Sequence, residues 1–179
     1  MTQIAATYAQ ALYDLAKDEN LTEEILAQLQ ALQESISQEP DFVRLLGTPS
    51  LSKEARCGIV DESFRDHVHT YVLSFMKILV EKGYIGHFAD CCKAYKAAYN
   101  EDHGILSVLA VTAVALSDAQ AQKLTEKLET ITGKSVELIN RVDPTVLGGV
   151  RLDYDGKRVD GTVKNRLDTI AGLLKNTVL

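Results

Sequence analysis

The segment GGVRLDYDGKRVDGTVKNRLDTIAGLL, residues 148–174, sets the architecture of the C-terminal part of the chain. Asp155 and Gly156 separate two short strand-like runs, and an Asp-Gly pair in this position is typical of the tight primed turn of a β-hairpin. Asp160 or Thr162 can cap a helix that follows the hairpin directly. The apolar stripe of that helix consists of Val163, Leu167, Ile170 and Leu174.

Three further elements precede the hairpin. Ile105–Leu116 is a continuous run of apolar and small residues rich in valine, which favours a buried strand. Ser117 and Gln120 form a capping box that begins a helix, and Gly133 ends it. Residues 136–142 then alternate as a second strand. The order strand, helix, strand, strand, helix predicts a small α/β domain with a right-handed crossover between its first two strands.

The first hundred residues have a different pattern, with apolar residues at helical spacing and short polar connections. We therefore predict five or six helices in a bundle. The expected segments are Ile4–Ala16, Leu21–Gln38, Asp41–Leu46, Ser52–Phe64, His67–Glu81 and Tyr84–Tyr99. A polar stretch at residues 101–104 suits a short linker, so we expect an all-α domain over residues 1–103 and the α/β domain over residues 104–179.

The composition excludes several classes of protein. The chain has 179 residues, of which 46% are apolar and 25% charged, with a net charge of −6. No run reaches the roughly 20 apolar residues that a spanning helix needs, so we expect no direct membrane span. The N-terminus lacks the basic and apolar blocks of a signal peptide, which favours a location inside the cell. Because no basic surface is clustered, we expect no nucleic-acid partner.

The three cysteines, Cys57, Cys91 and Cys92, are an odd number without CxxC spacing. This pattern argues against a disulfide framework and against a zinc site. A redox switch at the adjacent pair is an alternative, but neighbouring residues on a helix point about 100° apart. We expect reduced cysteines that pack in the core.

Motifs for cofactor or metal chemistry are weak. Gly148 and Gly149 do not belong to a phosphate loop, because strand-like residues follow them, and we expect them to allow positive φ or close backbone approach. His67 and His69 are two residues apart in a predicted helix and would lie on different faces. We therefore expect no cofactor and no metal ion.

Three acidic residues near the hairpin, Asp153, Asp155 and Asp160, have two interpretations. They could act as a catalytic carboxylate pair, which would make the chain a small enzyme. Strand alternation and turn chemistry explain the same residues without catalysis. We prefer the second interpretation and expect a non-catalytic protein.

The segment His67–Glu81 is apolar nearly all round, so it must be central in the bundle or bury one side against another molecule. The first segment carries four alanines between residues 5 and 11, which leave it thin on part of its surface. Together the two helices could floor a groove for a partner helix. The alternative is that these side chains only fill the bundle core.

At this point the sequence resembles a known family, the δ subunit of bacterial F-type ATP synthase, to which the mitochondrial oligomycin-sensitivity-conferring protein also belongs. The resemblance covers the whole length. It rests on YAQALYDLA at residues 8–16, on FMKILVEKGYIGHF at residues 75–88, and above all on DPTVLGGVRLDYDGKRVDGTVKNRLDTIAGLL at residues 143–174. The signature residues of this last motif are Gly148, Gly149, Gly156, Asp160, Thr162, Arg166 and Leu167.

The resemblance implies a stator subunit at the cytoplasmic side of the bacterial cell membrane. In this family an N-terminal six-helix bundle sits on the catalytic α3β3 head, and the smaller C-terminal domain binds the C-terminal ends of the b subunits of the peripheral stalk. The N-terminal helix of one α subunit packs between the first and fifth helices. Carried over by position, that groove would use Tyr8, Ala11, Leu12, Leu15, Phe75, Ile78 and Leu79.

Two positions depart from the family pattern. Tyr84 stands where the family often has arginine, which puts any partner contact of that arginine in doubt, and Thr162 replaces the usual serine but keeps a hydroxyl. The main rival interpretation is a helical-bundle adaptor that binds an amphipathic helix and is unrelated to ATP synthase. The C-terminal signature argues against it.

Overall fold

The computed structural model describes residues 3–48, 50–146 and 148–162. Contacts divide the chain into an N-terminal unit, Met1–Tyr99, and a C-terminal unit, Asn100–Leu179. This division lies a few residues upstream of the predicted one. The predicted linker is also partly helical, because the last helix of the first unit continues to Asp102.

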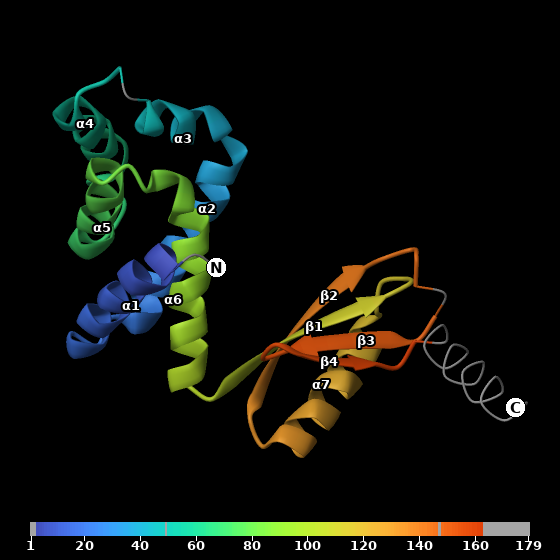
Figure 1. Ribbon diagram of the computed structural model, residues 1–179. Helices are drawn as coiled ribbons and strands as arrows, with labels where there is room; N and C mark the ends of the chain where they lie inside the picture. The colour runs from blue at the N-terminus through green and yellow to red at the C-terminus, as the bar shows by residue number, and fades with distance from the viewer. Residues whose placement is uncertain (1–2, 49, 147, 163–179) are drawn as a thin grey trace, which may run out of the picture. The chain divides into compact units, whose positions relative to one another are not determined.

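Helices are the only regular secondary structure in the described part of the N-terminal unit, and the C-terminal unit contains a small four-stranded sheet (Figure 1). This confirms the prediction of a helical first part and an α/β second part. The helices are α1 (Gln3–Asp18), α2 (Thr22–Gln38), α3 (Pro40–Gly47), α4 (Lys53–Phe64), α5 (Thr70–Glu81), the short 3-10 helix η1 (Ile85–His87) and α6 (Phe88–Asp102).

Side-chain caps and proline mark several of the helix ends in the N-terminal unit. The Ser52 hydroxyl accepts a hydrogen bond from the Ala55 N–H at 3.1 Å and caps α4. Pro40 follows the end of α2, and it also occupies the first turn of α3 and helps to begin that helix. Thr22 is already helical, and Leu21 before it makes no side-chain cap.

Helix α5 begins later than predicted. His69 is extended, with φ −62° and ψ 147°, and its Nδ1 atom accepts a hydrogen bond from the Tyr71 N–H at 3.2 Å. The histidine therefore caps the helix, so the prediction that His67 and His69 both lie within it is wrong. The His69 N–H donates to Gln28 Oε1 at 2.6 Å, which ties the start of α5 to α2.

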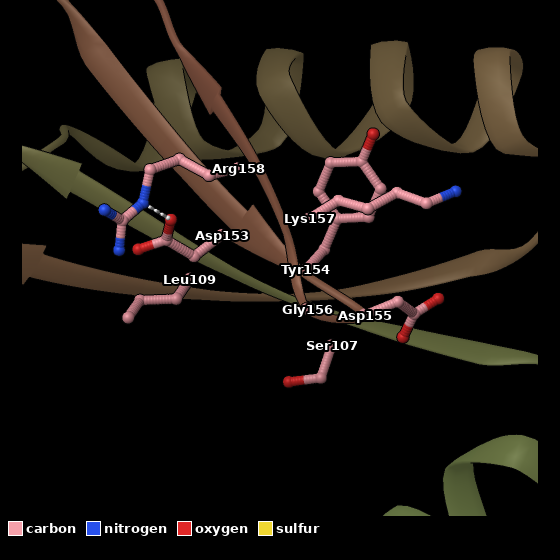
Figure 2. Close-up of a pocket in the computed structure, with 8 residues that line it drawn as sticks. All are labelled: Ser107, Leu109, Asp153, Tyr154, Asp155, Gly156, Lys157 and Arg158. Carbon is pink, nitrogen blue, oxygen red and sulfur yellow. Dashed lines mark hydrogen bonds and ion pairs between the residues drawn. The ribbon is translucent and has the colours of Figure 1, made fainter.

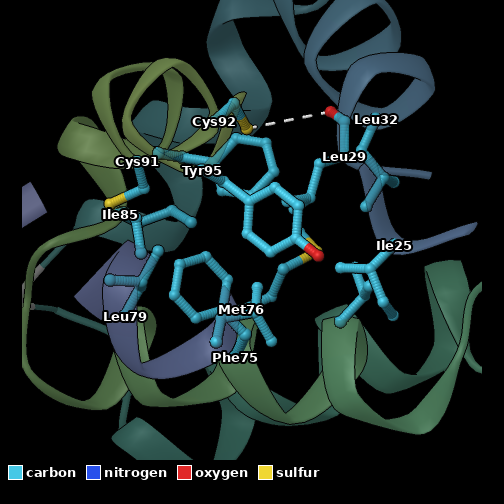
Figure 3. Close-up of a cluster of buried hydrophobic side chains, with 14 of the residues drawn as sticks. Ile25, Leu29, Leu32, Phe75, Met76, Leu79, Ile85, Cys91, Cys92 and Tyr95 are labelled. Carbon is cyan, nitrogen blue, oxygen red and sulfur yellow. Dashed lines mark hydrogen bonds between the residues drawn. The ribbon is translucent and has the colours of Figure 1, made fainter. Parts of the chain in front are cut away.

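The core of the N-terminal unit gathers buried side chains from all six α-helices. Figure 3 shows the Tyr95 ring in the middle of this cluster, near Met76 and Leu29. The Tyr95 hydroxyl donates to the Thr22 carbonyl at 3.1 Å, and the ring lies edge-on to Tyr13 with centroids 5.3 Å apart. Aromatic packing and a satisfied hydroxyl make Tyr95 an anchor of the core.

Two of the cysteines belong to this core, as predicted. Burial raises the pKa of the Cys91 thiol to about 11 and that of Cys92 to about 12. The Cys92 thiol donates to the Leu29 carbonyl at 3.7 Å (Figure 3). Cys57 is only half-buried. Protonated, buried thiols of this kind are unreactive packing residues.

The described part of the C-terminal unit has four strands in the order β2-β1-β3-β4. Its elements are β1 (Ile105–Thr112), α7 (Asp118–Thr132), β2 (Ser135–Val142), β3 (Val150–Tyr154) and β4 (Lys157–Asp160). β1 and β2, which α7 connects along the chain, form a parallel pair. The pair β1–β3 and the pair β3–β4 are antiparallel. The predicted order counted the hairpin as one strand, which is wrong, because its two arms are the separate strands β3 and β4. The predicted last helix lies outside the described residues.

The helix α7 has the ends that the sequence predicts. Ser117 and Gln120 form the capping box, and Gly133 closes the helix in the left-handed conformation at φ 66°. The predicted first strand is shorter than expected and ends at Thr112. α7 lies along one face of the sheet (Figure 1).

Candidate partner-binding surfaces

Three of the seven predicted groove residues are core residues. Leu12 on α1 is 5% exposed, and Phe75 and Leu79 on α5 are 6% and 0% exposed. All three belong to the same buried cluster. They can support a groove from below, but they offer a partner little surface of their own.

The other four groove residues reach the surface. Ala11 is exposed, Leu15 on α1 is 40% exposed and Ile78 on α5 is 42% exposed, while Tyr8 is half-buried. Leu15 and Ile78 are two of the three large apolar side chains that are exposed in the described part of the N-terminal unit, and Leu45 on α3 is the third. Exposed apolar side chains on two helices can contact a partner, because they are not used in packing the core.

Sequence reasoning missed one residue beside this surface. The Tyr84 ring lies edge-on to Tyr8 with centroids 6.0 Å apart, and it is tilted against His87 at 6.4 Å. Gly83 turns the chain after α5 with φ 75°. After this turn the Tyr84 N–H donates to the Leu79 carbonyl at 2.7 Å. Tyr84 therefore places an aromatic ring against Tyr8 of α1, just after the end of α5. The sequence could have predicted this position of Tyr84, because an apolar residue directly after a helix-ending glycine often folds back onto the helix.

The hairpin of the C-terminal signature has the predicted turn. Asp155 and Gly156 both have positive φ, 46° and 71°, as a type I′ turn requires. Gly148 has φ 149° and Gly149 has φ 82°. The prediction that this glycine pair has a conformational role is confirmed.

Gly149 is also fixed by a close backbone approach. A Cβ atom at this position would lie 2.5 Å from the carbonyl oxygen of Gly161 and 2.9 Å from the Cα atom of Thr162. No side chain fits in that space. The Gly161 N–H in turn donates to the Val150 carbonyl at 3.0 Å, so the segment after β4 is held against the beginning of β3.

Asp160 and Thr162 interact directly. The Asp160 Oδ1 atom accepts from the Thr162 N–H at 2.9 Å and from the Thr162 hydroxyl at 2.6 Å. These hydrogen bonds, the hydroxyl one first, lower the pKa of the Asp160 carboxyl. Thr162 is buried, and the hydrogen bond to Asp160 satisfies its hydroxyl there. The predicted signature residues Arg166 and Leu167 lie outside the described residues.

The acidic residues of the hairpin are engaged in structure. Asp153 Oδ1 accepts from Arg158 Nε at 2.7 Å across the β3–β4 ladder, and Arg151 Nε lies 3.5 Å from Asp153 Oδ2. The hydrogen bond from Arg158 lowers the pKa of the Asp153 carboxyl. A carboxyl that acts as a general acid at neutral pH needs a raised pKa, whereas the pKa of Asp153 is lowered, so Asp153 does not suit that role. Asp155 occupies the turn.

An open hollow of about 530 Å³ lies at this hairpin. Figure 2 shows the Asp153 carboxylate facing Arg158 at its edge, with Leu109 and Ser107 of β1 nearby. Within residues 3–48, 50–146 and 148–162, no cluster of three or more histidine, cysteine, aspartate or glutamate side chains is placed to hold a metal ion. In the same described ranges, no helix has both the length and the apolar character to cross a membrane.

Comparison with known proteins gives one consistent result. The family model "ATP synthase delta (OSCP) subunit" matches residues 4–174. The chain is 32% identical over 176 residues to an ATP synthase subunit delta of Clostridioides difficile, covering 98% of this chain and 97% of the relative. It is 33% identical over 172 residues to that of Lacticaseibacillus casei, covering 96% and 94%.

The fold has counterparts in solved ATP synthases. One chain of the Toxoplasma gondii mitochondrial ATP synthase hexamer superposes with a TM-score of 0.79 at 19% identity, covering 97% of this chain and 98% of that one. A chain of the Polytomella F-ATP synthase matches 55% of this chain with a TM-score of 0.50. The unrelated-adaptor interpretation finds no support in these matches. The chain belongs to the ATP synthase delta (OSCP) subunit family and is a non-catalytic peripheral-stalk subunit of ATP synthase.

Proposed function

We propose that this chain is the stator link between the catalytic α3β3 head and the b subunits, and that it resists rotor torque during proton-driven ATP synthesis. The N-terminal helices, as a six-helix bundle over residues 1–103, bind the head. Residues 104–179 bind the C-terminal ends of the b subunits. The complex holds the chain at the cytoplasmic side of the cell membrane as a peripheral protein. Family membership supports this proposal most directly.

The head-binding surface is the groove between α1 and α5, and its occupant is the amphipathic N-terminal helix of one α subunit. The observation that carries this assignment is the pair of exposed apolar side chains Leu15 and Ile78, 40% and 42% exposed. Burying two such side chains against an apolar helix face contributes about 1.5–3 kcal/mol each at most. The half-buried Tyr8, supported by Tyr84, forms one end of the same surface.

Ala11 sets how closely the partner helix can approach. It is exposed on α1, four residues before Leu15 and therefore on the same face. A small side chain here lets the backbones of two helices come together, as at close helix crossings elsewhere. The Ala11→Asp variant would place a charge in the apolar contact without touching the core of the bundle.

Apolar contact suits a stator better than isolated ion pairs do. A stator must stay bound under repeated load, and an exposed ion pair contributes only about 0–1 kcal/mol. The surface pairs of this unit illustrate the point, because the Arg44 and Asp41 side chains are 3.1 Å apart and are 82% and 85% exposed. We therefore assign the affinity for the head to Leu15, Ile78 and their neighbours.

The test is binding of the full chain to ATP synthase heads that lack this subunit. Leu15→Asp and Ile78→Asp should each weaken binding by about tenfold or more, because each places a charge in an apolar contact. Leu45→Asp is the matched control, since Leu45 is 43% exposed on α3 and lies outside the proposed groove. Equal loss of binding in all three variants, or no loss in the first two, would contradict the groove.

A further inference from the structure

Two tyrosines lie at one end of the proposed groove. Tyr8 belongs to α1, and Tyr84 comes shortly after the end of α5. Their rings meet edge-on, with centroids 6.0 Å apart and planes at 62°, and both side chains are half-buried. A half-buried tyrosine covers apolar surface with its ring and keeps its polar tip accessible. This end of the groove therefore differs in chemistry from the part where Leu15 and Ile78 are exposed.

The end of α5 fixes the backbone of Tyr84. Gly83 turns the chain with φ 75°, and its N–H donates to the Val80 carbonyl at 3.1 Å. The Tyr84 N–H donates to the Leu79 carbonyl at 2.7 Å. These two hydrogen bonds together define a Schellman motif, which closes a helix with a fixed backbone geometry. Tyr84 thus has a set position relative to α5 before any partner binds.

Ring contacts orient the Tyr84 side chain. Besides the edge-on contact with Tyr8, the Tyr84 ring lies 6.4 Å from the His87 ring, with the two planes tilted by 53°. Contacts between aromatic rings are favourable at such separations. A side chain that is already held by its neighbours loses little further freedom when a partner binds. The Tyr8–Tyr84 pair is therefore pre-organised for binding.

The hydroxyl groups of this pair are open to a partner. In the part of the chain that the structure describes, neither hydroxyl forms a hydrogen bond. The core residue Tyr95 shows the contrast, because its hydroxyl donates to the Thr22 carbonyl at 3.1 Å. A phenolic hydroxyl can donate one hydrogen bond and also accept. The hydroxyls of Tyr8 and Tyr84 can therefore bond to polar groups of another molecule.

Apolar contact alone does not fix the position of a helix along a groove. The hydrophobic effect is non-directional, and the apolar stripe of an amphipathic helix repeats at every turn. Leu15 and Ile78 would therefore also accept a partner helix that has shifted by one turn. A helix end, in contrast, has up to four backbone groups without intrahelical partners. Hydrogen bonds to these groups are directional and can form at only one place along the partner.

We propose that the Tyr8 and Tyr84 hydroxyls form hydrogen bonds to one end of the partner helix and so fix its position along the groove. This inference rests on the proposed function, in which the partner is the N-terminal helix of an α subunit. Tyr8 lies seven residues before Leu15 on α1, which is about 10 Å along the helix axis. The partner helix thus ends about two turns from its contact with Leu15.

The first experiment measures binding of full-length variants to ATP synthase heads that lack this subunit. Tyr8→Phe and Tyr84→Phe keep both rings and remove one hydroxyl each, so each should weaken binding by about three- to tenfold. Tyr84→Ala also removes the ring that holds Tyr8 and should weaken binding by more than about tenfold. Tyr154→Phe is the matched control, because Tyr154 is half-buried in the C-terminal unit. Unchanged binding of the Tyr8 and Tyr84 phenylalanine variants, or an equal loss in the control, would overturn the proposal.

The Leu15→Asp and Ile78→Asp variants, measured in the same assay, separate this inference from the groove itself. If they weaken binding while Tyr8→Phe and Tyr84→Phe bind like the unaltered chain, the groove stands and the role of the hydroxyls is wrong. If all four variants bind like the unaltered chain, the groove is wrong and both proposals fail together.

Cross-linking provides a readout of position that a loss of stability would not change. Ser74 is exposed on α5, four residues before Ile78 and therefore on the same face. A photo-reactive amino acid in place of Ser74 should link to one site on the partner helix when both tyrosines are present. In the variant with Tyr8→Phe and Tyr84→Phe together, the links should spread over neighbouring turns. The same single site in both chains would overturn the assignment of position to the hydroxyls.

Discussion

A comparison of helix α5 with helix α7 shows that the two units are stabilised internally in different ways. Six of the twelve residues of α5 are buried, including Phe75, Met76 and Leu79, whereas α7 has fifteen residues and none is classed as buried. α5 lies in a core shared by all the helices around it. α7 covers one face of a small sheet and is defined by its capping box and its closing glycine. The stability of the N-terminal unit thus depends on side-chain packing among several helices. The C-terminal unit depends more on local features such as helix caps and glycine turns.

The largest expected effect is the loss of a core anchor in the N-terminal unit. Tyr95→Ala should lower the free energy of unfolding by about 3–5 kcal/mol, because it leaves a cavity in the middle of the cluster. Tyr95→Phe keeps the ring and removes only the hydrogen bond to Thr22, so it should cost about 1 kcal/mol. Urea unfolding followed by far-ultraviolet circular dichroism measures both. Similar losses for the two variants would show that packing is not the main contribution.

The next effect is a backbone clash in the C-terminal unit. Gly149→Ala should cost about 2–3 kcal/mol, because its φ is 82° and the added Cβ would meet Gly161 at 2.5 Å. Gly133→Ala is the control, with φ 66° and nothing within 4 Å of the added Cβ. That variant should cost only about 1 kcal/mol. Equal costs, measured by hydrogen exchange of the sheet amides, would contradict the role of the close approach.

A smaller effect concerns the cap of α7. Ser117→Ala removes the side-chain acceptor of the Gln120 N–H and should cost about 1 kcal/mol. Ser117→Asp keeps an acceptor and adds a charge that suits a helix N-terminus, so it should retain most of the stability. Exchange rates of the amides in the first turn of α7 report the difference. A loss in the aspartate variant as large as in the alanine variant would exclude capping as the cause.

The smallest effect is the acid dependence of the hairpin. The pKa of the Asp153 carboxyl is lowered in the folded chain, so its contribution to stability is present above the unfolded pKa of about 3.9 and is lost as the pH falls through the folded value. Asp153→Asn should flatten the pH dependence of the unfolding free energy of the C-terminal unit below about pH 4. An unchanged slope would show that the pair with Arg158 has no influence on stability.

Much of the C-terminal unit could be predicted from sequence, because its devices are local. The Asp155-Gly156 turn, the Ser117 capping box and the conformational role of the Gly148-Gly149 pair each depend on a few adjacent residues. The contact of Gly149 with Gly161 could not be predicted, because it joins segments on opposite sides of the hairpin. The sequence suggested that the glycine was special but not what it meets.

The N-terminal unit was less predictable in detail. Helical periodicity located its helices, but the capping role of His69 shortened α5, because a histidine ring can act as an acceptor at an N-cap. Periodicity also offers no means of dividing the groove residues into the buried Phe75 and Leu79 and the exposed Leu15 and Ile78. That division depends on how neighbouring helices cover each side chain.

Capture of partners by a tagged full chain from gently solubilised membranes tests the stator assignment as a whole. The unaltered chain should bring down α, β and b subunits in fixed proportion. A variant with Leu15→Asp and Ile78→Asp together should lose α and β and keep b, because only the proposed head-binding surface is damaged. A variant that keeps all of these partners, or loses head and stalk together while still folded, would contradict the assignment of head binding to the α1–α5 groove and stalk binding to the C-terminal unit.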